Sequence, residues 1–341
     1  MVSMKDIARE CNVSVATVSK ALNGYSDIGR QKREEIQETA RRLGYFPNSS
    51  ARALKTKRTW NLGVLFSDAT RSGLTHSYFA AILDSFKVYA EERGYDITFV
   101  GMGQVGGRRM SYYEHCRYRG LDGVVIANID FTTPEVQELI DSSLPVVTID
   151  FSFGGRTMVA SDNRKGMYDL TRYVLSMGHR KLAYIHGDGN TVTLERMESF
   201  LKATGEYGIA VPQERMPEGR FRDVACTEKL TLKVLSSGER PTCIFFPDDY
   251  AAVGGINAIR RSGLRVPDDI SICGYDGIPI SEAVSPRMTT LRQDTRRIGQ
   301  TAARELIAEI EQPDYRSGQI ILIEGKVSEG GSVRRIQEDG E

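Results

Sequence analysis

The sequence predicts two unequal parts: a small all-α unit at the N-terminus, and a larger α/β body of two doubly wound lobes with parallel sheets. This prediction rests on three observations. Residues 4–43 contain three short amphipathic helical patterns. From Trp60 onward, short apolar runs alternate with helical stretches, as in parallel sheets covered by helices. The chain has 341 residues, which is too many for one ordinary hydrophobic core.

The formal net charge of zero conceals an uneven distribution of charge along the chain. Residues 1–60 contain 12 Lys and Arg against 6 Asp and Glu, so this part carries +6 and the remainder carries −6. A basic surface attracts phosphate groups. The asymmetry therefore favours nucleic acid as a partner of the N-terminal part.

The composition, with 40% hydrophobic and 26% charged residues, is that of a globular protein. No apolar run approaches the roughly 20 residues of a membrane span. The N-terminus lacks the apolar stretch of a signal peptide, so we expect a cytoplasmic protein that does not enter a membrane. The five cysteines are scattered and form no C-x-x-C, which argues against a disulfide framework and a zinc site.

Patterns typical of enzymes are weak. No G-x-S-x-G, G-x-x-x-x-G-K or H-E-x-x-H motif occurs, and the four histidines show no metal-ligand spacing. Residues 101–106 (GMGQVG) fit G-x-G-x-x-G, so a dehydrogenase with a dinucleotide site is an alternative. The run follows the second expected strand rather than the first, which favours a glycine-rich surface loop. We therefore expect no enzymatic activity, no cofactor and no metal.

Residues 4–23 contain two short amphipathic segments that meet at a tight junction. Ser14 stands where the N-cap of the second segment is needed, because its hydroxyl can accept a backbone N–H. Two helices joined by such a turn form a helix-turn-helix, whose second helix can enter the major groove of DNA. The alternative is a plain helical hairpin used for oligomerisation, which would leave a sugar-binding module without DNA activity.

A third helix is expected at residues 30–43, with Gly44 ending it and Pro47 breaking the chain. Residues 49–55 then show a very short helical pattern. A helix of this length is marginal by itself in water. We expect it to order only against its copy in a second subunit or against DNA.

Several of these residues carry a resemblance to a known family. Residues 4–8 (MKDIA), 13–19 (VSVATVS), 22–23 (LN), 43–48 (LGYFPN) and 51–54 (ARAL) resemble the lactose/galactose-repressor (LacI/GalR) family. The resemblance implies a helix-turn-helix DNA-binding domain at 1–47, a hinge helix and linker at 48–59, and a periplasmic-binding-protein-like effector and dimerisation body at 60–341. It further implies a nucleoid-associated homodimer on a near-palindromic operator, with paired hinge helices in the central minor groove.

The resemblance also assigns roles within the DNA-binding part. Val15 and Ala16 open the recognition helix, where apolar contact suits a thymine methyl group. Lys20 stands where many members have Arg, and it lacks the bidentate fork that suits guanine. Leu54 matches a hinge leucine that wedges into the central base step. The residues expected to contact DNA are Ser14, Val15, Ala16, Thr17, Lys20, Asn23, Tyr45, Ser49, Arg52, Leu54 and Lys55, of which Ser14, Asn23 and Tyr45 are expected at phosphates.

In the body, the first lobe is expected to contain strands 62–66, 97–100, 123–127 and 146–149, with helices near 77–93, 107–118 and 134–142. The second lobe is expected to contain helix 163–177, strand 182–185, helices 193–205 and 222–237, strand 243–246, helix 249–262 and strand 270–273. Crossovers between the lobes are expected near 160–163, 288–293 and 320–324. Ligands of such folds bind outside the carboxyl ends of the strands.

Matched residue by residue, the resemblance places the effector site at Asp68, Tyr78, Phe79, Asp150, Arg196, Phe221, Asp248 and Asp276. Arg196 would grip effector oxygens, and Asp276 would close the cleft. Arginine between carboxylates suits vicinal hydroxyls, since each sugar hydroxyl both donates and accepts. Asp248 replaces the Asn of many members, and its added negative charge favours a neutral sugar. A purine is the alternative effector.

Overall fold

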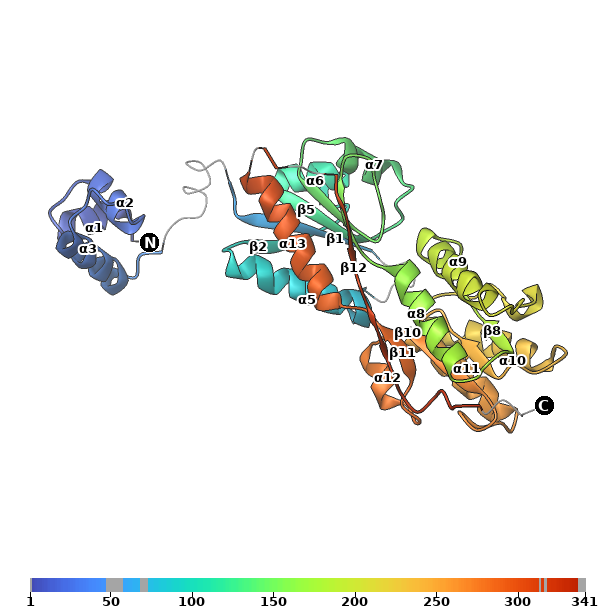
Figure 1. Ribbon diagram of the computed structural model, residues 1–341. Helices are drawn as coiled ribbons and strands as arrows, with labels where there is room; N and C mark the ends of the chain where they lie inside the picture. The colour runs from blue at the N-terminus through green and yellow to red at the C-terminus, as the bar shows by residue number, and fades with distance from the viewer. Residues whose placement is uncertain (1, 47–57, 68–72, 313, 316–317, 337–341) are drawn as a thin grey trace. The chain divides into compact units, whose positions relative to one another are not determined.

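The computed structural model describes residues 2–46, 58–67, 73–312, 314–315 and 318–336. The chain divides into two compact units, Met1–Thr59 and Trp60–Glu341 (Figure 1). Within the described ranges, no helix is both long and apolar enough to cross a membrane.

The N-terminal unit consists of three helices, α1 (Met4–Glu10), α2 (Val15–Leu22) and α3 (Arg30–Leu43). Ser14 caps α2, because its hydroxyl accepts the Thr17 N–H at 3.0 Å. Gly44 ends α3 in the left-handed conformation. Residues from all three helices form one small core, which includes Ile7, Ala8, Cys11, Val18, Ala21, Ile36 and Ala40. The predicted helix-turn-helix is confirmed.

The first lobe of the body contains a six-stranded, all-parallel sheet with the order β12-β7-β6-β5-β1-β2. Its strands are β1 (Asn61–Phe66), β2 (Asp96–Val100), β5 (Gly123–Asn128), β6 (Val146–Ile149), β7 (Thr157–Ser161) and β12 (Ile320–Ile323). Helices α5 (Ser77–Glu92) and α13 (Thr295–Glu311) pack side by side on one face, and α6 (Tyr112–Arg119) and α7 (Pro134–Asp141) cover the other (Figure 1). Because both faces are buried, β5 reads as a continuous apolar run.

The second lobe contains a five-stranded sheet with the order β13-β11-β10-β9-β8. Its strands are β8 (Leu182–Tyr184), β9 (Cys243–Phe245), β10 (Ser271–Asp276), β11 (Thr289–Arg292) and β13 (Lys326–Ser328), of which only β13 runs antiparallel to its neighbour. Helices α8 (Asn163–Ser176) and α9 (Thr191–Gly205) cover one face, α10 (Val224–Ser236) and α11 (Asp249–Arg261) cover the other, and α12 (Pro279–Ala283) follows β10.

The chain passes between the two sheets three times: between β7 and α8, between β11 and α13, and between β12 and β13. The predicted crossovers near 160–163, 288–293 and 320–324 agree with this path, with the second and third at the ends of β11 and β12. One expected element was wrong in part. Residues 107–111 are not helical, since β3 (Gln104–Val105) and β4 (Arg108–Arg109) form a short hairpin before α6. Positive φ angles at Gly106 and Gly107 make the hairpin turn there.

Candidate functional site

Helix α2 presents one face to the core of the N-terminal unit and the other to solvent. Val18 and Ala21 are fully buried, whereas Val15 remains 41% exposed although it is apolar. Ala16 is exposed beside Val15. An apolar residue left in water at the start of a recognition helix suits contact with a thymine methyl group.

Several polar side chains that are expected to contact DNA already have partners within the N-terminal unit. The hydroxyls of Ser14 and Thr17 lie 2.9 Å apart and bond each other. The Asn23 amide donates to the Ser19 carbonyl at 2.6 Å, and Tyr45 packs against the small core. Free donors for phosphate are therefore fewer on this surface than residue types alone indicate.

Lys20 has a partner that sequence reasoning did not identify. Its Nζ lies 2.5 Å from Oδ2 of Asp27, in the segment between α2 and α3. The remaining expected DNA contacts, Ser49, Arg52, Leu54 and Lys55, lie outside the described residues, as does the expected effector residue Asp68.

In the body, the described effector candidates come from the carboxyl ends of strands and from nearby helices. A chain of polar contacts joins the two lobes there. The Tyr78 hydroxyl at the start of α5 lies 3.4 Å from Asp150 Oδ2 and 3.3 Å from Gln293 Oε1. Gln293 Nε2 in turn donates to Asp276 Oδ1 at 2.6 Å. Asp150 follows β6 of the first lobe, and Asp276 ends β10 of the second.

Arg196 of α9 is 4% exposed and belongs to the part of this polar cluster that the second lobe contributes. Its Nε donates to Asn163 Oδ1 at 2.9 Å, and its Nη1 donates to the Pro247 carbonyl at 3.1 Å. The guanidinium lies 3.5 Å above the ring of Tyr275 and 5.9 Å from that of Phe221. Among the described residues it forms no ion pair within 4.0 Å. A buried cation with unused donors is suited to ligand oxygens.

The acids around Arg196 are harder to ionise than isolated carboxyls. Burial raises the pKa of Asp150 to about 6, against the opposing charge of Arg196. Burial likewise raises the pKa of Asp276 to about 7, with Arg196 again opposing and Asp248 adding to the rise. The second carboxylate oxygen of Asp150 has no hydrogen-bond partner among the described residues. These acids can thus accept or donate to a ligand near neutral pH.

Two of these acids also adopt backbone conformations that L-residues rarely take. The φ angle is +60° at Asp150 and +103° at Asp276. Such strain costs free energy and persists where the surroundings enforce it, commonly at functional sites. The strain therefore supports a role for both side chains in binding.

Other expected effector residues have mainly structural contacts. Asp248 is 2% exposed and caps α11, with its oxygens accepting the Ala251 N–H at 2.8 Å and the Arg222 N–H at 2.7 Å. Phe79 packs in the first-lobe core. Phe221 lies against Gly187, where an added Cβ would be 2.3 Å from the ring. Both oxygens of Asp248 are therefore already engaged by backbone N–H groups, and burial raises the pKa of this carboxyl as well.

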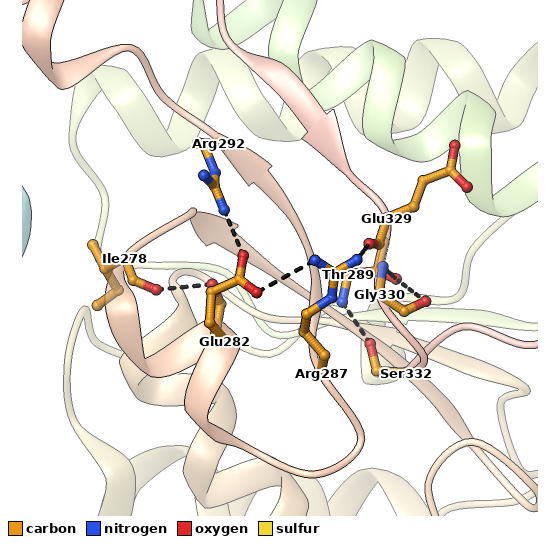
Figure 2. A network of polar contacts seen from close by, with 9 residues as sticks. Ile278, Glu282, Arg287, Thr289, Arg292, Glu329, Gly330 and Ser332 are labelled. Atoms are coloured by element: carbon orange, nitrogen blue, oxygen red, sulfur yellow. Dashed lines mark hydrogen bonds and ion pairs between the residues drawn. The ribbon is translucent and has the colours of Figure 1, made fainter.

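Arg292, the residue before Gln293 at the end of β11, is held by an ion pair with α12. Figure 2 shows Glu282 of α12 between two arginines, with Oε1 2.5 Å from Arg292 Nη2 and Oε2 3.3 Å from Arg287 Nη1. Gly277 makes close contact with Arg292 possible, since an added Cβ would be 2.6 Å from the Arg292 Cα. The end of β11, and hence Gln293, is fixed relative to Asp276.

Sequence reasoning missed Asp27, Asn163, Asp249, Tyr275 and Gln293. Asp249 is fully buried and accepts the Ile278 N–H at 2.9 Å and the Thr290 hydroxyl at 2.5 Å. Two adjacent acids at the start of a helix are explained by capping alone, so the sequence pattern does not single out Asp249. Gln293 follows a strand that contains two threonines, and no local pattern indicates its partners.

A helix-turn-helix unit joined to a two-lobed body with a buried polar cluster at its strand ends defines a ligand-responsive DNA-binding regulator. Comparison with known proteins gives the particular family. Residues 3–48 match bacterial regulatory proteins of the lacI family, and residues 171–333 match a periplasmic binding protein-like domain. The chain belongs to the LacI family and is a DNA-binding transcriptional regulator with an effector-binding body.

Relatives are similar along nearly the whole chain. The probable HTH-type transcriptional repressor ExuR of Bacillus subtilis (strain 168) is 29% identical over 324 residues, covering 94% of this chain and 95% of that protein. The HTH-type transcriptional repressor PurR of Vibrio cholerae (strain M66-2) is 27% identical over 322 residues, with 92% and 93% covered. Both are repressors rather than enzymes by description.

The fold has solved counterparts. The structure of the lac repressor dimer bound to operator and the anti-inducer ONPF is 23% identical, with a TM-score of 0.80 over 98% of this chain and 99% of that one. The predicted fold class, an all-α DNA-binding domain with a periplasmic-binding-protein-like body, is confirmed.

Proposed function

We propose that this regulator represses genes of sugar metabolism as a homodimer on a near-palindromic operator, and that a neutral sugar between its lobes controls it. The proposal rests on the buried guanidinium of Arg196, which lies near several carboxyls but forms no ion pair within 4.0 Å among the described residues. As a chromosome-bound regulator it would act in the cytoplasm. The domain boundaries at 47 and 59 and the roles of the individual residues belong to the same proposal.

The effector class follows from the balance of donors, acceptors and charge. Arg196 can only donate, whereas Asp150 and Asp276 accept when ionised and donate when protonated. Vicinal hydroxyls both donate and accept, so they match this set. Three acids, Asp150, Asp248 and Asp276, lie around one arginine, and burial raises the pKa of each. An anionic ligand would raise these pKa values further and would meet more acids than bases, so a neutral ligand suits the site better.

Two solved structures of similar fold support a sugar as the effector. One is described as transcriptional regulator CelR in complex with cellobiose, and another as a LacI family regulator from Enterococcus faecium with bound ribose. A purine remains the second candidate, because Phe221 places an aromatic face beside the Arg196 guanidinium, where a base could stack.

Control of DNA binding would pass through the hinge. Effector binding between the lobes would change their relative orientation within each subunit and hence the spacing of the two hinge segments at 48–59. Short helices order only with a partner, so this spacing would set operator affinity. Coupling of this kind is reciprocal, and operator binding must change effector affinity by the same factor.

A thermal-shift screen of the full chain tests the effector class. The panel contains neutral monosaccharides and disaccharides, sugar acids and purines. We expect a neutral sugar to raise the melting temperature, corresponding to about 2.7 kcal/mol when its concentration is 100 times Kd. Arg196→Lys should lose the shift, because lysine cannot reproduce the planar fork. Arg164→Lys, on a side chain 56% exposed, is the matched control and should keep it.

A shift with sugar acids or purines and none with neutral sugars would overturn the proposed effector class. Binding of duplex DNA by the same chain, followed by fluorescence anisotropy with the salt concentration recorded, would be unaffected by that outcome.

A further inference from the structure

The last turn of α6 lies beside the point where the chain enters the body. Strands β1, β2 and β5 run parallel, so they begin at the same edge of the first-lobe sheet. Trp60 precedes β1 and is held at this edge, because its N–H donates to Asp122 Oδ2 at 2.8 Å and its carbonyl accepts the Asp96 N–H at 2.8 Å. Helix α6 ends at Arg119, three residues before Asp122. Three residues span at most about 11 Å, so the end of α6 stays close to Trp60.

This turn carries three exposed side chains that can contact phosphate. Arg117, Tyr118 and Arg119 are all exposed, and Tyr118 is 60% exposed although its ring is apolar. The Arg119 guanidinium lies 5.7 Å from the centroid of the Tyr118 ring, and its Nε lies 3.4 Å from His115 Nε2. Within the described part of the chain, neither arginine forms an ion pair within 4.0 Å. Both guanidinium groups therefore keep donors for an outside partner.

The backbone that carries these side chains is fixed. Cys116 is fully buried in a core of the first lobe, and Gly120 ends α6 in the left-handed conformation. At the start of the helix, Ser111 and Glu114 form a capping box. A surface that is already ordered loses little conformational entropy when it binds a partner.

Helix stability explains part of this arrangement but not all of it. Basic residues in the last turn of a helix interact favourably with the helix dipole. That interaction does not require a tyrosine whose ring lies in water between two arginines of the sequence. Arginine and tyrosine commonly bind the phosphates of DNA, and arginine can do so with two parallel N–H groups. The composition of this turn therefore suits duplex DNA.

Proximity to DNA comes from the connection of the chain rather than from net charge. Asp96 and Asp122 lie at the same edge and offset part of the positive charge, so long-range attraction is weak there. Between α3 and the body there are only 16 residues, 44–59, which span at most about 55 Å when extended. A duplex held by the helix-turn-helix unit therefore stays at high local concentration near the body, and a weak contact becomes populated.

We propose that Arg117, Tyr118 and Arg119 form a second DNA contact, in which the body binds phosphates of the duplex that the helix-turn-helix unit holds. This contact is separate from the base contacts of that unit, and it does not depend on the effector proposed above. Because phosphates are the same in every sequence, the contact adds affinity and fixes the body on the duplex without selecting bases.

Anisotropy titrations of the full chain at several salt concentrations test this contact. The probes are a duplex that the wild type selects from a random pool, and an unrelated duplex of equal length. Arg117→Gln, Arg119→Gln and the double variant remove the charges, and Tyr118→Phe removes only the hydroxyl. Arg261→Gln is the matched control, because it removes one charge from a side chain that is 73% exposed on α11 of the second lobe. Thermal unfolding checks that each variant is folded.

Each arginine substitution should weaken binding of both duplexes by about fivefold at low salt, and should reduce the slope of log affinity against log salt by about 0.9. The double variant should reduce the slope by about 1.8, whereas Tyr118→Phe should weaken binding about twofold with an unchanged slope. Arg261→Gln should match the wild type.

The proposal is overturned if the double variant binds both duplexes as Arg261→Gln does. It is also overturned if the affinity of the double variant falls while its salt slope stays unchanged, since the turn would then act through the linker and not on phosphate. If the double variant does not fold, the two single variants decide by the same criteria.

Discussion

Replacing Asp276 with Asn should stabilise the body at and above neutral pH. Burial raises the pKa of this carboxyl from 3.8 to about 7. A folded-state pKa above the unfolded value means that the folded state binds more protons, so stability falls as pH rises from about 4 to about 7. Asn does not ionise, and its side-chain oxygen can still accept from Gln293 Nε2, which donates at 2.6 Å in the wild type.

The size of the effect follows from the shift. About three pKa units at about 1.36 kcal/mol each give an upper value near 4 kcal/mol. Asp276 as a whole residue is only partly buried, so solvent screens part of the effect and we expect about 2 kcal/mol at pH 8. At pH 5 the wild-type carboxyl is largely protonated when folded, and the difference between the two proteins should be smaller.

Denaturant unfolding followed by tryptophan fluorescence measures this difference. Trp60 is the single tryptophan, and it packs against the first-lobe core. Asp268→Asn, on an acid 57% exposed, is the control and should change stability equally little at pH 5 and pH 8. If the gain for Asp276→Asn were the same at both pH values, or negative at pH 8, the burial argument would be refuted.

Three further results are expected. Leu54→Ala should weaken operator binding by anisotropy while leaving effector-induced thermal shifts intact, and unchanged operator affinity would remove the wedge role. Gly254→Ala should cost about 2–3 kcal/mol in denaturant unfolding, because its Cβ would lie 2.1 Å from the Val224 carbonyl oxygen, whereas Gly205→Ala has open space and should cost nothing. Ser14→Ala should destabilise α2 by about 1 kcal/mol, seen as faster amide hydrogen exchange there than in the wild type.

The sequence predicted the buried strands that consist of a continuous apolar run, and it missed the interior strand β7, whose residues TMVAS mix polar and apolar types. In β5, Val124 and Ile126 face one layer of helices while Val125 and Ala127 face the other, so the run is apolar throughout. Strand β11 was not predicted, because its residues TTLR mix polar and apolar types. Helix α13 was missed as well, since it returns to the first lobe after a strand of the second, and local periodicity says nothing about that return.

The same limit applies to the site. Arg196 and Asp276 were identified because each matches a family position. Gln293 was not identified, although it joins Asp276 to the first lobe, because its contact with Tyr78 spans 215 residues of sequence. Asp27 was missed for a related reason. Its contact with Lys20 depends on the position of its segment, and in the folded unit Arg33 holds that segment by donating to two of its backbone carbonyls.

The segment after β10 links the polar cluster to the first lobe mechanically. Asp276 bonds Gln293, while Ile278, two residues later, is buried in the first-lobe core. The Ile278 N–H is held by Asp249 of the second lobe at 2.9 Å. One short segment is therefore anchored in both lobes at once. A ligand that draws Asp276 toward itself must also move Ile278 within the first-lobe core or rotate that lobe. Because packed cores resist deformation, rotation is the less costly response.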